Sequence, residues 1–358
     1  VDMVDIFKQL ALALDQMPEG YPETESGVEL KLLRKIYSEV DAEIFLKLRR
    51  KPDTAEMIAK RLDKPVDEMR AILDTMARNG QIASYTLSGQ QRYSTAPFVP
   101  GIYEFQINRL DQEFVELMDE YFPTFHKALG QHFPAVARTL PVHEMVESES
   151  KIQPYDDVRK MFDKAKSFRV MDCICRIDRG MLGEGCDHEL ENCLTFSQEE
   201  KAYDYFSIAG RVIDKSEALE IISNSAQQGL VHNVLYNVQE GQGAVCNCCS
   251  CSCGLLRSAK ELKSPNVVAS SDFVAKIDPD ECSVCGECAE ERCPMAAIIE
   301  SDGYYKVQPK LCIGCGVCAI TCPTESITLE LKPTSEKVAP PVNMREWFTT
   351  RATNRGLT

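Results

Sequence analysis

The chain has 358 residues and a net charge of −15, which disfavours nucleic acid as a partner of the whole chain. Its length exceeds one ordinary hydrophobic core, so two or three domains are expected. No apolar run reaches the roughly 18 residues that a membrane-spanning helix needs, and residues 1–14 lack the basic start of a secretory signal, so we expect a cytoplasmic protein.

The first part of the chain is rich in charged helix formers. Apolar spacing predicts four helices, at residues 28–38, 42–48, 54–62 and 66–78. Two alternating stretches around Ser88-Gly89 then predict a hairpin. The order helix, helix, turn, helix, hairpin resembles the winged helix–turn–helix family, which implies a domain of that fold over residues 1–96.

The second part, residues 97–271, has the mixed pattern of an α/β domain. Helices are predicted at 110–129, 155–165, 198–209 and 215–228, with strands at 168–174 and 230–238. After a third part at 272–331, residues 332–358 contain three prolines and no long periodic segment. We therefore expect an α+β multidomain protein that ends in an extended tail.

The cysteines are concentrated in one stretch of the chain. All 17 lie between Cys173 and Cys322, in clumps at short spacing. In a reducing compartment such clumps indicate ligation of a soft metal, by zinc or iron–sulfur, and not a set of disulfides.

Residues 272–331 contain two copies of one cysteine run. The second copy is Cys312-x2-Cys315-x2-Cys318-x3-Cys322-Pro and the first is Cys282-x2-Cys285-x2-Cys288-x4-Cys293-Pro, with one extra residue. Zinc ribbons use separated Cys-x2-Cys pairs instead. The segment resembles the dicluster bacterial ferredoxins, and in such runs the fourth cysteine serves the other cluster.

Two [4Fe–4S] clusters are therefore expected here. One ligand set is Cys282, Cys285, Cys288 and Cys322, and the other is Cys312, Cys315, Cys318 and Cys293. Gly286, Gly314 and Gly316 are expected to let the backbone approach the clusters.

Nine further cysteines lie in the middle domain. They are Cys173, Cys175, Cys186, Cys193, Cys246, Cys248, Cys249, Cys251 and Cys253. They could hold two more [4Fe–4S] clusters with one residue left over, or one cluster with spare thiols or a zinc site. Because Cys248 and Cys249 are adjacent, they are not expected to serve the same metal. Thiol exchange chemistry is a minority alternative.

This stretch resembles a cysteine-rich module found beside ferredoxin domains in anaerobic microorganisms, which implies iron–sulfur binding. The resemblance rests on the Cys173-x-Cys175-Arg segment, the Cys186-x-His188 segment and the Cys-Asn-Cys-Cys run at 246–249. Ser252 stands where the module has a further cysteine. His188 could be a ligand, although a histidine in this place more often donates a hydrogen bond.

The combined pattern favours electron transfer. No nucleotide-binding or paired-histidine motif occurs, and no catalytic residue is predicted. We expect a relay subunit of a cytoplasmic, anaerobic oxidoreductase complex, docked to redox partner subunits, flavin-containing ones among them. The alternative is a redox-sensing transcription regulator. It is disfavoured because the helix in the recognition position, residues 66–79, has more acidic than basic residues.

Overall fold

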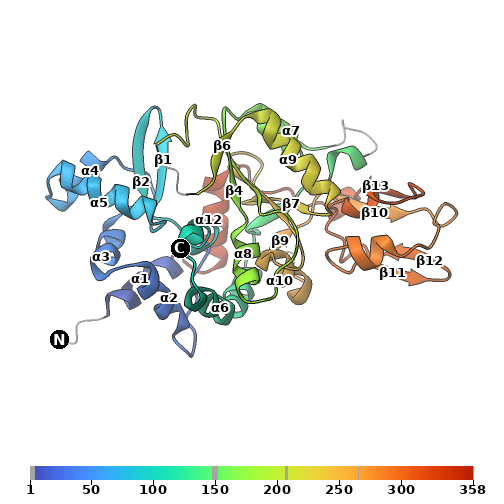
Figure 1. Ribbon diagram of the computed structural model, residues 1–358, viewed down its shortest axis with the longest axis horizontal. Helices are drawn as coiled ribbons and strands as arrows, with labels where there is room; N and C mark the ends of the chain where they lie inside the picture. The colour runs from blue at the N-terminus through green and yellow to red at the C-terminus, as the bar shows by residue number, and fades with distance from the viewer. Residues whose placement is uncertain (1–4, 147–151, 206–208, 265, 358) are drawn as a thin grey trace.

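The structure is a computed structural model, which describes residues 5–146, 152–205, 209–264 and 266–357. It is a mixed α/β protein with several separate sheets. Along its longest axis, Figure 1 shows N-terminal helices, a central sheet and the cysteine-dense segment in that order. Within the described ranges, none of the helices combines the length and the apolar character that a membrane span requires.

The N-terminal helices pack around one large apolar core that includes Leu32, Phe45, Ile58 and Leu73. The elements are α1 (Ile6–Asp15), α2 (Val28–Ile36), α3 (Glu39–Lys47), α4 (Ala55–Leu62), α5 (Val66–Arg78), β1 (Ala83–Leu87) and β2 (Gln90–Ser94). The four predicted helices and the hairpin are thus present, because their apolar positions meet in one core. Membership of the winged helix–turn–helix family stays a prediction.

Helices from two later parts of the chain complete this core. They are α6 (Gln112–Gly130) and α12 (Met344–Asn354). Trp347 of α12 is fully buried and donates to the carbonyl of Ala135 at 2.9 Å. Buried Arg351 donates to the carbonyl oxygens of Pro18 at 2.9 Å and Leu129 at 3.0 Å. The expectation of an extended tail was therefore wrong over these residues.

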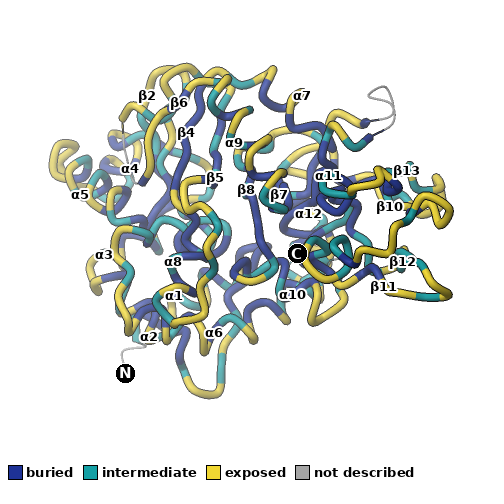
Figure 2. Tube along the Cα trace, turned by 45° about the vertical axis from the view of Figure 1, so that its right-hand side comes forward, coloured by how far each residue is buried: buried dark blue, intermediate teal, exposed yellow. Residues whose placement is uncertain are grey.

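A seven-stranded sheet forms the centre of the molecule, in the order β6-β4-β5-β8-β7-β3-β9. Neighbouring strands are antiparallel except for β3 and β9. The strands are β3 (Ala137–Thr139), β4 (Ser167–Asp172), β5 (Glu191–Ser197), β6 (Arg211–Ile213), β7 (Val231–Leu235), β8 (Ala244–Cys248) and β9 (Val268–Ala269). In Figure 2 the trace through the middle of this sheet is dark blue, the colour of buried residues.

The two faces of the sheet carry different side chains. Leu194, Phe196 and Val245 share a buried core with α7 (Val158–Asp163) and α9 (Lys215–Gln227). Because side chains alternate along a strand, the residues between them face the opposite side. That side meets α8 (Ile174–Met181) and α10 (Gly254–Leu262), which both contact α6.

The helix predicted at 198–209 is not formed over its described part. Residues 201–205 are turns and bends. Four of the eight residues at 198–205 are charged. The segment therefore has too few apolar residues on one face to pack a helix against the sheet. Residues 206–208 lie outside the described part of the chain.

The C-terminal cysteine segment consists of two small antiparallel sheets. Its elements are β10 (Phe273–Ile277), β11 (Ile298–Ser301), β12 (Tyr304–Val307), α11 (Val317–Ile320) and β13 (Ile327–Leu331). β10 pairs with β13, and β11 pairs with β12, so the first and last strands close around the cysteine loops. Figure 2 shows much of this end as exposed.

A buried ion network joins this segment to the central sheet. Arg138 of β3 donates to Asp156 at 2.5 and 3.0 Å and to Asp272 at 2.9 Å. All three residues are at most 3% exposed. Tyr155 donates to the second oxygen of Asp272 at 3.0 Å. Each oxygen of the two carboxylates thus accepts a hydrogen bond. Because Asp272 directly precedes β10, the network fixes the start of β10 relative to the central sheet.

We expect Arg138→Met to destabilise the protein by about 3–5 kcal/mol, because it leaves two carboxylates buried without their cation. Urea unfolding followed by circular dichroism, without oxygen, measures this change. The matched control is Arg159→Met, which removes an exposed pair with Glu144 and should cost less than about 1 kcal/mol. Equal losses in the two variants would contradict the role given to Arg138.

Candidate metal centres

The eight C-terminal cysteines line two small hollows. The hollow farther from the central sheet, here called the outer set, is lined by Cys282, Cys285, Cys288 and Cys322. The other, the inner set, is lined by Cys293, Cys312, Cys315 and Cys318. The structure thus brings together the two groups of four predicted from the spacing, with the last cysteine of each run beside the other triplet.

The surroundings of these thiols suit a cluster with four thiolate ligands. Burial raises the pKa of Cys293, and the backbone N–H of Ala297, which donates to its sulfur at 3.2 Å, opposes that rise. Cys322 lies 3.3 Å from the hydroxyl oxygen of Ser326, and its pKa is lowered by hydrogen bonds against the effect of burial. Such bonds stabilise a thiolate.

The three predicted glycines all have left-handed backbone angles, with φ of +86° at Gly286, +70° at Gly314 and +82° at Gly316. Gly314 is the most constrained of them. A Cβ atom there would lie 2.1 Å from the carbonyl oxygen of Phe273 and 2.3 Å from the hydroxyl of Ser271. The glycine is therefore needed for contact with β10, in addition to any approach to a cluster.

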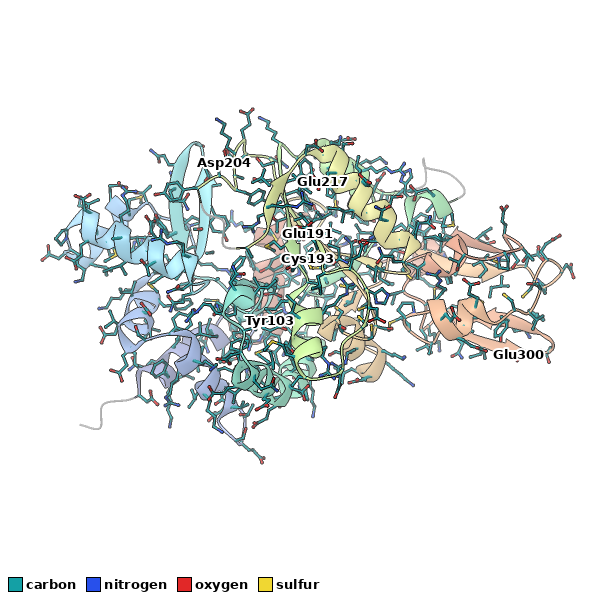
Figure 3. All side chains as sticks on the ribbon, viewed as in Figure 1. Tyr103, Glu191, Cys193, Asp204, Glu217 and Glu300 are labelled. Carbon is teal, nitrogen blue, oxygen red and sulfur yellow. The ribbon has the colours of Figure 1, made fainter. Side chains whose placement is uncertain are left out.

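Six of the nine central cysteines form a closed ring of neighbouring thiols. The ring runs in the order Cys173, Cys175, Cys253, Cys248, Cys246, Cys193 and back to Cys173. We call it the six-thiol ring. Figure 3 places Cys193 near the centre of the molecule.

The strand register explains why these thiols meet. Cys193 of β5 lies directly opposite Cys246 of β8, and Met171 of β4 lies opposite Cys193. Cys248 is two residues beyond Cys246 and so projects from the same face. Cys173 and Cys253 each stand immediately before a helix, α8 and α10 respectively. The ring therefore combines strand ends and helix starts on one face of the sheet.

A polar network behind the ring holds the two strands in place. Arg176 donates to the side-chain oxygen of Asn192 at 2.7 Å and to the carbonyl of Asn247 at 2.8 Å. Asn247 in turn lies 2.6 Å from Nδ1 of His232. Burial acts to lower the pKa of Arg176, but the thiols of Cys173 and Cys249 raise it above its usual range. Arg176 therefore remains a cation beside the thiols.

The remaining three cysteines form a second, tighter group with a histidine. The ligand atoms of Cys186, His188, Cys249 and Cys251 all lie within 4.8 Å of one another, and the sulfurs of Cys186 and Cys249 are 3.7 Å apart. We call this the Cys3His group. Nδ1 of His188 is buried without a hydrogen-bond partner among the described residues. Adjacent Cys248 and Cys249 thus lie in different groups, as expected from their positions.

Two thiols of the Cys3His group are shifted in opposite directions, since burial and the neighbouring thiols raise the pKa of Cys251 to about 12 while that of Cys186 falls. Burial raises the pKa of Cys186, but hydrogen bonds with Ser252, His188 and Cys251 outweigh it and bring the pKa to about 6. The sulfur of Cys186 lies 3.3 Å from the hydroxyl oxygen of Ser252. Ser252, which replaces an expected cysteine, therefore contacts this group as a hydrogen-bond partner.

Sequence reasoning missed several residues around the ring. His126 of α6 is buried against Gly254, where a Cβ atom would come within 2.7 Å of its ring, and burial lowers its pKa to about 3. Tyr103, labelled in Figure 3, donates to Asp178 of α8 at 2.9 Å. Neither residue belongs to a motif, but Gly254 directly after Cys253 was a signal of close packing.

Comparison with known proteins identifies one family. Residues 305–328 match the 4Fe-4S binding domain (Fer4), a segment that contains Cys312, Cys315, Cys318 and Cys322. Neither the curated proteins nor the solved structures include a significant match to the chain. The protein therefore contains a 4Fe–4S binding domain, which implies at least one cluster. It also has a cysteine-rich region outside the matched residues.

We expect Gly314→Ala to lower the iron content of the anaerobically purified protein, because the new methyl group would push the loop of the inner set away from β10. Gly303→Ala is a matched control. Gly303 has a similar φ of +82° in the turn between β11 and β12, but nothing lies within 4 Å of its added Cβ. The control should cost about 1 kcal/mol of stability and no iron. The two variants are compared by their iron and acid-labile sulfide per chain. Equal iron contents would contradict the role given to the contact between Gly314 and β10.

Proposed function

We propose that the protein relays electrons between a partner at its outer cysteine set and a centre on the six-thiol ring. The observation that supports this best is the continuity of the cysteine sites. Cys318 lines both C-terminal hollows. Cys315 of the inner set shares one buried core with Cys248 and Cys253 of the ring. The three sites thus follow one another through packed protein, without an intervening domain boundary.

In this proposal the outer and inner sets each hold one [4Fe–4S] cluster. The four thiols around each hollow, and the glycine contact of Gly314 with β10, support that assignment. A cluster with four cysteine ligands supplies electron transfer and no open position for a substrate. The ring has more thiols than one such cluster needs, so we propose that it holds a further iron–sulfur centre.

The surface at the outer set suits a basic redox partner. Cys285 is exposed, and its neighbours include several exposed acidic residues. They are Asp278, Asp280, Glu281, Glu290, Glu291 and Glu300. Figure 3 shows Glu300 at the far end of the molecule. Lys276 of the same region is paired with Glu330 at 2.8 Å, so it offsets little of this charge. Charge of one sign accelerates the encounter with a partner of the opposite sign.

The contacts of the N-terminal hairpin speak against the alternative of a transcription regulator. The backbone N–H of Ser88, at the hairpin tip, donates to Glu199 of the central domain at 3.2 Å. On α5, Arg70 is bound to Glu56. A hairpin and helix held in this way offer few free cations to phosphate groups.

The relay is tested by electron transfer from the reduced protein to cytochrome c, a basic one-electron acceptor. We expect the rate in a stopped-flow experiment to fall as salt rises, because salt screens the acidic surface. Cys285→Ser should slow the transfer and change the EPR spectrum of the reduced protein. Cys251→Ser, in the Cys3His group, is the control and should leave the rate unchanged. A salt-independent rate that Cys285→Ser does not alter would contradict the proposal.

For the Cys3His group we propose a single tetrahedral metal ion, zinc above all, instead of another cubane. Ligands of one zinc ion at about 2.3 Å stand about 3.8 Å from each other, close to the 3.7 Å between Cys186 and Cys249. The thiols of a cubane bind separate irons and stand farther apart. The unpartnered Nδ1 of His188 supplies the fourth ligand.

Elemental analysis of the anaerobically purified protein should therefore find one zinc per chain besides iron. Cys186→Ser and His188→Ala should each lose the zinc and keep the iron. His143→Ala, outside every cysteine group, is the control and should keep both metals. Loss of iron in proportion to these substitutions would instead assign the group to a cluster.

A further inference from the structure

A large cavity adjoins the six-thiol ring on the side of the N-terminal hairpin. It has two connected compartments of about 490 and 590 Å³, which share walls at Tyr85, Thr195 and Tyr236. Cavities of several hundred Å³ are the usual size of small-molecule sites. In Figure 1 the hairpin β1–β2 stands beside the edge of the central sheet, and residues of β1 and β5 line both compartments. Electron transfer alone requires no such space.

The strand register places the ring at the inner end of this cavity. Cys193 and Cys246, opposite each other on β5 and β8, line the first compartment. One step of two residues along the same face, Thr195 lies opposite Arg169 of β4 and Ala244 of β8. This row is about 7 Å from the thiols, since strands rise about 3.4 Å per residue. A small molecule can therefore reach both rows at once.

Arg169 is a buried cation at this row without an acidic partner among the described residues. It is 7% exposed, its Nε donates to the hydroxyl of Thr195 at 3.2 Å, and it lies 4.8 Å from the centre of the Tyr203 ring. Burial lowers its pKa, as expected for a cation removed from water. An uncompensated buried charge is costly. An anion in the cavity would balance it.

The other charged residues on the cavity wall are Arg50, Glu104 and Asp172, of which Asp172 is an exposed carboxylate at the end of β4. Arg50 is paired with Glu19 at 2.7 Å and stacks on Phe348 at 3.7 Å from the ring centre. Glu104 accepts from the backbone N–H of Gly101 at 2.7 Å. Among the charged residues described on this wall, Arg169 is thus the cation available to a ligand.

The rest of the wall favours a flat, apolar body. Aromatic rings of Tyr85, Phe105, Tyr203 and Tyr236 line the two compartments, and they come from the hairpin, the following loop and the central domain. Such rings stack on planar ligands. Together with a guanidinium, which binds carboxylates in a bidentate manner, they describe one class of ligand.

We propose that this cavity binds a small aromatic carboxylate, with its carboxylate on Arg169 and its ring directed toward Cys193 and Cys246. The bound molecule would be the end point of the proposed relay. This is the only respect in which the ligand site rests on the proposed function. The ligand would contact the six-thiol ring at Cys193 and Cys246, the two ring thiols that line the cavity.

The test is isothermal titration calorimetry on the anaerobically purified, iron-loaded chain, with benzoate as the probe. Benzamide has the ring without the charge, and acetate has the charge without the ring. We expect benzoate to bind in a 1:1 ratio and to bind at least about tenfold more tightly than either of the others. Equal affinity for benzamide, or no binding of benzoate, overturns the proposal.

Variants locate the site. Arg169→Gln should weaken benzoate binding at least about tenfold, and Arg169→Lys should restore part of it. Arg211→Gln on the neighbouring strand β6 is the control, because Arg211 is exposed and paired with Glu191. If Arg169→Gln fails to fold, Tyr85→Ala on the exposed hairpin removes one aromatic wall and should also weaken binding. Unchanged affinity in these variants overturns the assignment.

Iron content, EPR spectrum and the rate with cytochrome c are measured on the same samples. They should be unchanged by Arg169→Gln. Failure of the relay would appear in those readouts, and failure of the ligand site in the calorimetry alone.

Discussion

The alternation of side chains along β5 and β8 is the constraint on which the rest of the structure depends. One face of these strands supplies Leu194, Phe196 and Val245 to an apolar core. The other face supplies thiols and the wall of a cavity. A shift of register by one residue would move every thiol into the core. The buried network of Arg176, Asn192 and Asn247 fixes that register, so it holds the six-thiol ring in place.

A second constraint acts where the cysteine-dense end meets the sheet. The carboxylates of Asp156 and Asp272 come from different segments and converge on Arg138. The backbone N–H of Val142 also donates to the carbonyl of Cys315 at 2.8 Å. The relay proposed above needs fixed spacing between its cysteine sites. Ionic and backbone contacts provide that spacing here better than apolar packing alone would, because their geometry is directional.

Helices and cysteine runs could be predicted from the sequence, whereas strand pairing and contacts between distant segments could not. Helix α5 and both cysteine runs of the C-terminal segment follow from apolar period and spacing. Helix α12 was missed because its two buried side chains are Trp347 and Arg351, which give no apolar stripe. The grouping of the central thiols depends on the pairing of β5 with β8, which no local pattern encodes. Arg169 could have been noticed, since a charge within the apolar run at 168–171 signals an unusual environment.

The position of α12 has a consequence for the order in which the protein is made. Its residues close a core that begins with α1, and Arg355 donates to Asp15 at the other end of the chain. The N-terminal core therefore cannot be completed until residues 344–354 have been made, although domains usually fold from the N-terminus as they emerge. All 17 cysteines precede α12 in the chain, since the last of them is Cys322. The thiols are thus present in the chain before the core that α12 closes can be complete.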